Sequence, residues 1–183
     1  MNGNLIVITG PSGVGKGSLV KKLLANSSKY ALSISATTRK IREGEENGKD
    51  YFFISEKDFD HLIQKNGFLE WAQFAGARYG TLRSEVEQKT KLGQRVILEI
   101  ELAGARQIMK SSPEAAFIFI APPNLEVLRD RLLQRGTESP AEIDDRIRIA
   151  QEEIAAQAEF DIVLINDDLE ASFEQLLNYC ESL

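Results

Sequence analysis

One segment near the start of the chain, residues 4–18, constrains the fold more than any other. The apolar and β-branched run Leu5–Thr9 is followed there by a loop with the spacing Gly-x-x-x-x-Gly-Lys, from Gly10 to Lys16. This spacing is typical of a strand, a tight phosphate-binding loop and a helix. Glycine lets the backbone approach an anion closely, and N–H groups at the start of the next helix point toward the phosphates. We therefore predict a site for a nucleoside triphosphate. Its expected contacts are Gly10, Pro11, Ser12, Gly13, Val14, Gly15, Lys16, Gly17 and Ser18.

The residue after the lysine departs from the usual pattern. A serine or threonine normally follows the lysine directly, and its hydroxyl binds Mg²⁺. This chain has Gly17 at that position and Ser18 one residue later. Ser18 is therefore the candidate protein ligand of Mg²⁺ in this loop.

The length and the composition indicate a single acidic domain. A chain of 183 residues can bury the core of a single compact domain, and its formal net charge of −6 argues against a nucleic-acid-binding surface. Cys180 is the only cysteine, which excludes an internal disulfide, and we expect it to pack in a helix. The chain has no apolar run of membrane-spanning length and no secretion signal at its beginning. We therefore expect a cytoplasmic protein that binds neither nucleic acid nor a membrane.

Strand patterns and helix patterns alternate along the chain, which predicts an α/β fold. Several of the strand-like runs are apolar on both faces, as in a parallel sheet covered by helices on each side. We therefore expect a five-stranded parallel sheet flanked by helices. The expected strands are Leu5–Thr9, Ala31–Ser35, Val96–Ile100, Ala116–Ala121 and Asp161–Ile165. The expected helices are Lys16–Asn26, Leu102–Lys110, Leu125–Gln134, Pro140–Ala158 and Leu169–Glu181.

Two segments interrupt this alternation. Residues 37–92 are rich in turn, charged and aromatic residues, and we interpret them as a small α+β insertion. Residues 131–148 include a break between two helical patterns, and we interpret them as a lid. The core domain would then consist of residues 1–36, 93–130 and 149–183.

Basic residues and a tyrosine at the start of the insertion suit a phosphate. Arg39 and Arg42 stand beside hydroxyl residues, and guanidinium groups bind phosphates through paired donors. The turn at Asn47-Gly48 brings Tyr51 into the neighbourhood. The alternative is an ordinary solvated basic loop.

Three glutamates occupy positions where a carboxylate is unusual. Glu70 follows the apolar pair Phe68-Leu69, and it needs a partner if it is buried; otherwise it is a surface residue of an edge strand. Glu99 and Glu101 stand at the carboxyl end of a core strand, where ligands bind in open α/β sheets.

A group of arginines surrounds the predicted lid. Arg131, Arg135 and Arg146 stand where cations could close over transferring phosphates. Arg129 and Arg148 are interpreted as members of surface ion pairs, which contribute little to stability.

Taken together, these motifs resemble those of the guanylate kinases, over nearly the whole chain. The matching motifs are Ser35-x-Thr37-Thr38-Arg39-x-x-Arg42, Gly44-Glu45-x-Asn47-Gly48-x-Asp50-Tyr51, Glu70-Trp71-Ala72, Tyr79-Gly80-Thr81, Arg131-Leu132-x-x-Arg135-Gly136-Thr137 and Asn166-Asp167. The resemblance implies a P-loop kinase fold with a GMP-binding insertion and a lid. It also implies the reaction of ATP with GMP to give ADP and GDP, with Mg²⁺ accompanying ATP.

The resemblance implies a role for each matching residue. Glu70 and Glu99 would accept hydrogen bonds from N1–H and the exocyclic amine of guanine, which adenine cannot offer in the same way. Asn166 would contact the adenine of ATP, and Glu101 would approach Mg²⁺ through water, although relatives usually carry aspartate there. The implied GMP-binding residues are Ser35, Arg39, Arg42, Tyr51, Glu70, Tyr79, Thr81 and Glu99. The implied catalytic residues are Lys16, Arg39, Arg131, Arg135 and Arg146.

Two alternative functions remain open at this point. One is a catalytically inactive guanylate-kinase-like module that binds protein partners; the intact loop with Lys16 argues against it. The other is a kinase of the same fold with a different acceptor, which Glu70 and Thr81 argue against.

Overall fold

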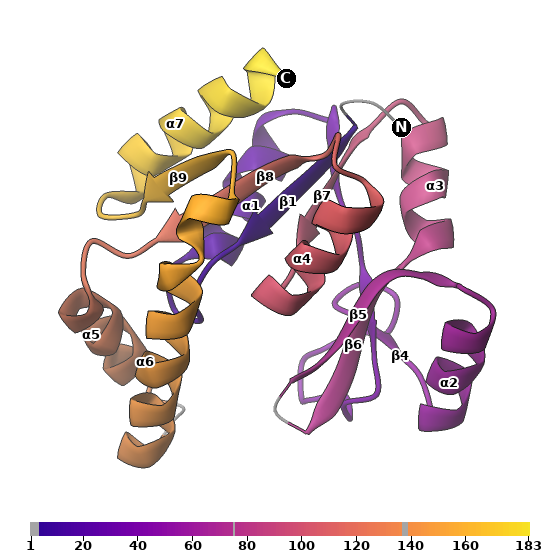
Figure 1. Cartoon of the computed structure of the whole chain (residues 1–183), viewed down its shortest axis with the longest axis horizontal. Helices are drawn as coiled ribbons and strands as arrows, with labels where there is room; N and C mark the ends of the chain where they lie inside the picture. Colours follow the sequence, from indigo (N-terminus) through magenta and orange to yellow (C-terminus); the bar gives the residue numbers. More distant parts are fainter. Residues whose placement is uncertain (1–3, 75, 137–138) are drawn as a thin grey trace.

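A parallel sheet forms the centre of the molecule (Figure 1). The computed structural model describes residues 4–74, 76–136 and 139–183, and in this part of the chain the sheet has five strands. All four pairings between neighbouring strands are parallel, which confirms the predicted fold class. The spatial order is β2 (Tyr30–Leu32), β7 (Arg95–Glu99), β1 (Leu5–Thr9), β8 (Ala116–Ala121) and β9 (Ile162–Ile165).

Helices cover both faces of this sheet because the central strands are apolar on both sides. In β1, Ile6 and Ile8 belong to one buried cluster, whereas Leu5 and Val7 belong to the other. The first cluster includes residues of four helices, and the second includes residues of two. The helices of the first cluster are α1 (Lys16–Asn26), α5 (Leu125–Arg135), α6 (Pro140–Ala155) and α7 (Leu169–Ser182). Those of the second are α3 (Arg83–Lys91) and α4 (Leu102–Ser111).

A second, mixed sheet lies beside the core. Its described strands are, in spatial order, β4 (Phe52–Phe53), β3 (Ser35–Thr37), β6 (Ala77–Leu82) and β5 (Phe68–Phe74). Helix α2 (Glu56–Gln64) packs on this sheet through Phe59, which contacts Phe68 with ring centroids 4.4 Å apart. Ser55 caps α2 by accepting a hydrogen bond from the Asp58 N–H, as expected for a helix that begins at this point.

One predicted strand is wrong in its end point. The run Ala31–Ser35 does not form a single strand, because the chain leaves the parallel sheet after Leu32. The Ile34 N–H bonds to the Glu85 carboxylate, and Ser35 instead pairs with Thr81 in the second sheet. The helix predicted for Pro140–Ala158 is also shorter, since α6 ends at Ala155 and a 3₁₀ turn, Gln157–Glu159, follows.

Two further features agree with the sequence. Ser139 and Glu142 form the reciprocal capping box expected at the start of α6. Cys180 is buried in the core. In the described residues, no helix has the length and apolar character needed to cross a membrane.

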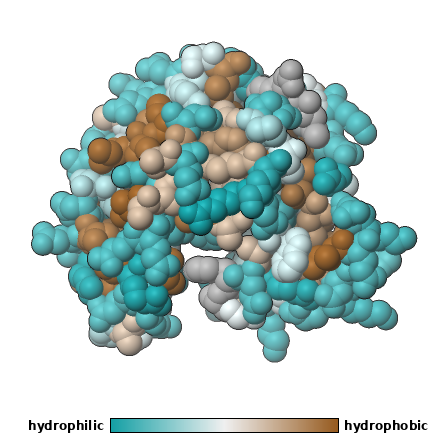
Figure 2. Space-filling view, viewed as in Figure 1, coloured by the Kyte–Doolittle hydropathy of each residue, from teal (hydrophilic) through white to brown (hydrophobic). Residues whose placement is uncertain are grey.

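The second sheet and α2 extend from the core on one side, and α5 and α6 extend on the other (Figure 1). Figure 2 shows a cleft between these two parts of the surface. The predicted limits of the insertion and of the lid stay predictions, and positions 137 and 138 of the lid lie outside the described residues.

Candidate active site

The glycine-rich loop between β1 and α1 passes very close to other backbone and side-chain atoms. Gly10 has φ of 151°, and a Cβ there would lie 2.1 Å from the Ile120 carbonyl oxygen. Gly15 has φ of 100°, and a Cβ there would lie 2.4 Å from Nδ2 of Asn166. Both positions therefore require glycine, for conformation and for space.

The end of β9 supports this loop from the side. Asn166 is buried, and its Nδ2 donates a hydrogen bond of 2.7 Å to the Val14 carbonyl. The Val14 side chain is buried in the core, and its N–H bonds to the Pro11 carbonyl at 3.2 Å. Asn166 and Val14, both predicted to contact ATP, thus hold the loop in shape.

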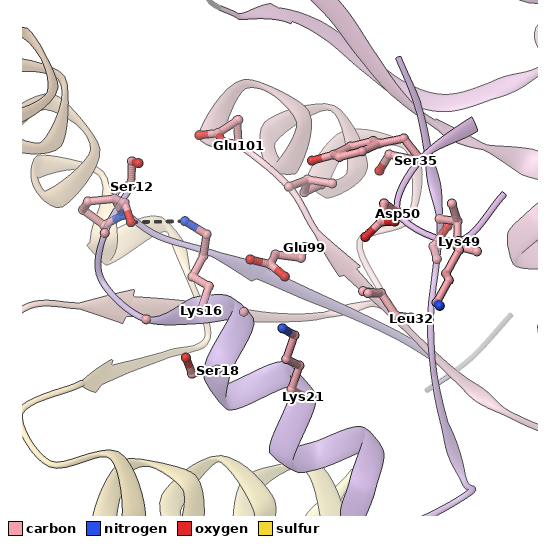
Figure 3. A pocket seen from close by; sticks show the side chains of 18 residues that line it. Ser12, Lys16, Ser18, Lys21, Leu32, Ser35, Lys49, Asp50, Glu99 and Glu101 are labelled. Carbon is pink, nitrogen blue, oxygen red and sulfur yellow. Dashed lines mark hydrogen bonds between the residues drawn. The ribbon is translucent and has the colours of Figure 1, made fainter. Parts of the chain in front are cut away.

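A cavity of about 500 Å³ opens beside the loop (Figure 3). Lys16 lies over the loop, where its Nζ donates to the carbonyl oxygens of Gly10 and Pro11. Ser18 is exposed on the first turn of α1. The predicted loop residues that line this cavity are Pro11, Ser12, Gly13, Gly15, Lys16, Gly17 and Ser18.

Glu99 lies beside the beginning of α1. A Cβ at Gly17 would lie 3.7 Å from Glu99 Oε1, an ordinary contact distance, so Gly17 is not required by lack of space. Figure 3 places the Glu99 carboxylate near Lys16 and Lys21. Burial raises the pKa of Glu99, and the positive charge of Lys16 partly offsets this effect.

A second cavity of about 320 Å³ shares walls with the first. Ser35, Tyr51, Glu99 and Glu101 line both cavities. The second cavity also brings together other predicted GMP-binding residues from the insertion. These are Arg39, Arg42, Glu70 and Tyr79.

Arg39 is fixed in this cavity by the turn around it. Thr37 Oγ1 accepts a hydrogen bond from the Arg39 N–H, and the guanidinium makes two bonds to Glu45, of 3.0 and 2.6 Å. The guanidinium also lies 5.4 Å from the ring centroid of Tyr51, whose ring packs edge-on at 5.9 Å from Tyr79. The Glu45 carboxylate raises the pKa of Arg39, and the same pair lowers the pKa of Glu45. The charged guanidinium of Arg39 is therefore paired with Glu45 in the lining of this cavity.

Glu70 is the most deeply buried acid of the insertion cavity, with 5% of its surface exposed. Its Oε1 accepts hydrogen bonds from the N–H of Thr81, at 3.0 Å, and from its hydroxyl, at 2.6 Å. This contact follows from the strand pairing, because Glu70 stands opposite Thr81 in register. Burial raises the pKa of Glu70, and the two bonds to Thr81 oppose that rise. Thr81 is not among the residues that line the cavity, but it holds the Glu70 carboxylate that does.

The arginines of the predicted lid occupy different surroundings. Arg146 lines the second cavity and donates to the Ser12 hydroxyl of the loop. Arg131 donates to the carbonyl of Val14 in the loop, at 3.4 Å, and to the carbonyl of Asp167 after β9, at 3.3 Å. The side chain of Arg135 lies outside the described part of the structure.

The remaining arginines of this region form surface pairs, as expected. Arg129 bonds to Asp144 at 2.6 Å, and Arg148 reaches Glu152 at 3.4 Å. These side chains are all at least 44% exposed, so they contribute little to stability.

Two acidic residues of the site were not predicted from the sequence. Glu45 holds Arg39, and Glu153 of α6 is buried next to Glu101. Burial and the neighbouring Glu101 carboxylate raise the pKa of Glu153 to about 7. Helix periodicity contained a signal for Glu153, because it follows the buried positions Ile147 and Ala150 on the same helix face.

Comparisons with known proteins converge on one family. A family model described as guanylate kinase matches residues 2–183. The chain is 54% identical to a guanylate kinase of Prochlorococcus marinus over 178 residues, which cover 97% of each chain. It is 49% identical to a guanylate kinase of a Synechocystis species, over 97% of this chain and 93% of the relative. Its fold is similar to the crystal structure of guanylate kinase from Anaplasma phagocytophilum, with a TM-score of 0.76 and 28% identity, over 97% of this chain and 84% of the other.

Proposed function

The chain belongs to the guanylate kinase family, and from this premise we propose how its own residues carry out the reaction. It is an ATP-dependent nucleoside monophosphate kinase that transfers the γ-phosphate of ATP to GMP. The relatives, at 49 to 55% identity, favour this function over an inactive binding module and over a kinase with another acceptor.

ATP would bind with its phosphates on the loop Gly10–Ser18, and GMP would bind in the cavity between the insertion and the core. Lys16 holds its ammonium group over the loop. Arg146 lines the second cavity and donates to Ser12, which lines the first. Both cations would stabilise negative charge on the transferring phosphoryl group. The attacking oxygen of GMP is already anionic, so no general base is needed.

The GMP phosphate would replace the Glu45 carboxylate as the partner of the Arg39 guanidinium. The Arg39–Glu45 pair presents two parallel donors, which is the geometry that a phosphate accepts. Arg42, Tyr51 and Tyr79 would supply further donors.

The single observation that supports GMP as acceptor is the buried Glu70 carboxylate held by Thr81. A carboxylate accepts hydrogen bonds only from a base edge with donors, and guanine offers N1–H and an amine on that edge. Ser35 lines the same cavity. A base without these donors would leave a buried charge unpaired, which binding sites reject strongly.

For the other two carboxylates, the geometry favours an exchange of the roles expected from the resemblance. Glu99 faces Gly17 and Lys16, so we propose that it acts near the phosphates. Glu101 lines the same cavity as Glu70 and contributes to the raised pKa of Glu70, so we propose that it binds on the guanine side.

The residues near the loop suit Mg²⁺ bound together with ATP. Mg²⁺ in kinases is held by few protein oxygens together with phosphate and water, and the described residues contain no cluster of three or more acidic, histidine or cysteine ligands. The Glu99 carboxylate and the Ser18 hydroxyl would hold it, with Glu99 in place of the Glu101 that the resemblance implies. When bound, Mg²⁺ neutralises charge on the phosphates.

The acceptor specificity can be measured directly. ADP formation from ATP is followed with GMP, AMP, CMP or UMP as acceptor, and GMP is expected to react by far the fastest. The Lys16→Met variant is the control, expected to lose about 10²–10³ in kcat while its circular dichroism spectrum stays unchanged. Equal rates with GMP and AMP would contradict the proposal.

A further inference from the structure

Helix α4 contains a glycine where its backbone does not call for one. Gly104 lies in the first turn of the helix, without a positive φ, and glycine has a lower helix propensity than alanine. It is buried, so the reason for the missing side chain should lie in what surrounds it.

The space beside Gly104 is filled by the Glu70 carboxylate. A Cβ at position 104 would lie 2.3 Å from Glu70 Oε2 and 2.9 Å from its Cδ. Both distances are far below a van der Waals contact. The carboxylate cannot simply turn away, because its Oε1 is held by the N–H and hydroxyl of Thr81.

A second residue of α4 fixes the main chain next to Glu70. Gln107 stands three positions after Gly104 and therefore on the same helix face. Its side-chain amide accepts from the Trp71 N–H at 3.2 Å and donates to the Trp71 carbonyl at 2.7 Å. Because β5 is an edge strand, Gln107 pairs with main-chain groups that no neighbouring strand reaches.

We propose that Gly104 and Gln107 are positioning residues that set the guanine specificity of this kinase. Gly104 leaves the space in which the Glu70 carboxylate lies. Gln107 fixes the position of β5, the strand that carries Glu70, relative to helix α4. The inference rests on the proposed function, in which Glu70 accepts hydrogen bonds from guanine. It adds that helix α4 of the core holds the Glu70 carboxylate of the insertion in the position where it binds the base.

The Gly104→Ala variant tests the first half of this proposal. The added methyl group displaces the carboxylate, so the KM for GMP is expected to rise on the order of tenfold, the effect of losing a hydrogen bond to a charged group. The KM for ATP and the kcat at saturating GMP should change much less. IMP lacks the exocyclic amine, so the preference for GMP over IMP in kcat/KM should fall as well.

Substitutions at Glu70 separate this inference from the proposed function. If Glu70→Ala leaves the KM for GMP unchanged, the proposed role of Glu70 is wrong and the inference fails with it. If Glu70→Ala raises this KM but Gly104→Ala does not, only the inference fails. In the Glu70→Ala background the methyl group has room, so adding Gly104→Ala should have no further effect on the KM.

Gly104→Ala could prevent folding, and a second variant covers that case. Aspartate is one methylene shorter than glutamate, so Glu70→Asp combined with Gly104→Ala should restore the Tm that Gly104→Ala alone lowers. A Tm that stays low in the double variant would overturn the assignment, because the clash would then not be with the carboxylate.

The Gln107→Met variant tests the second half. Methionine keeps the length and helix propensity of the side chain but makes neither bond to Trp71. We expect a raised KM for GMP with the KM for ATP unchanged. Lys110→Met, at an exposed residue of the same helix for which no bond to Trp71 is seen, is the matched control and should behave as wild type. Equal effects of the two methionine variants on the KM for GMP would overturn the role of Gln107.

Discussion

Glu153 is a buried glutamate on α6, and its replacement by glutamine is expected to stabilise the protein at pH 8 much more than at pH 5. Only 7% of its surface is exposed. Burial and the nearby Glu101 carboxylate both disfavour its charged form. Glutamine has nearly the same shape and carries no charge, so Glu153→Gln removes this unfavourable ionisation and keeps the packing.

The magnitude follows from the pKa of Glu153. This pKa is raised from 4.5 to about 7 in the folded protein, so ionisation destabilises the folded state by up to about 3 kcal/mol, at about 1.4 kcal/mol per pKa unit. Between these two values the folded state binds more protons than the unfolded chain. The stabilisation by the neutral carboxyl is therefore complete below pH 4.5 and is lost as the pH rises through 7.

The assay is urea unfolding of wild type and Glu153→Gln at several pH values from 5 to 8. The difference in unfolding free energy should be small at pH 5 and grow to a maximum above pH 7, in favour of the variant. Glu152→Gln is the matched control at an exposed neighbouring position, and it should change stability by less than about 0.5 kcal/mol at each pH. A difference between wild type and Glu153→Gln that does not vary with pH would refute the reasoning.

Two further substitutions test the insertion and the loop. Arg39→Lys keeps the charge but loses the guanidinium fork that binds Glu45 through two bonds. Steady-state kinetics should show about a tenfold higher KM for GMP and little change in the KM for ATP. An equal rise in both KM values would contradict this prediction. Gly10→Ala places a Cβ 2.1 Å from the Ile120 carbonyl oxygen and should cost about 2–5 kcal/mol in urea unfolding. Gly44 also has a positive φ but has open space beside it, so Gly44→Ala should cost clearly less, and equal losses would argue against the steric explanation.

Most of the secondary structure could be predicted because its signals are local. The strand Leu5–Thr9 and the helix Lys16–Asn26 have the predicted bounds, since an apolar run and a glycine-rich loop mark them in consecutive residues. The single strand predicted for Ala31–Ser35 is wrong because its two ends belong to different sheets. Ser35 pairs with Thr81, which lies far along the chain and does not influence the local hydrophobic pattern.

In the site, too, individual residues could be predicted from the sequence, whereas the contacts between them could not. Glu70 could be singled out because a carboxylate among apolar residues is unusual, but its bonds to Thr81 and its contact with Gly104 depend on how β5, β6 and α4 pack. Glu99 and Glu101 could be identified as a pair at a strand end. Which of them faces the loop depends on where the chain turns into α4.

The sequence by itself determined the phosphate-binding loop, the alternation of strands and helices, and the membership of the family. These properties are encoded in residue spacing over short segments. Only the tertiary structure decided that Glu153 is buried against Glu101, that Glu45 holds Arg39, and that a core helix seats Glu70. Such contacts join side chains from distant segments, and packing between the layers brings them within reach of one another.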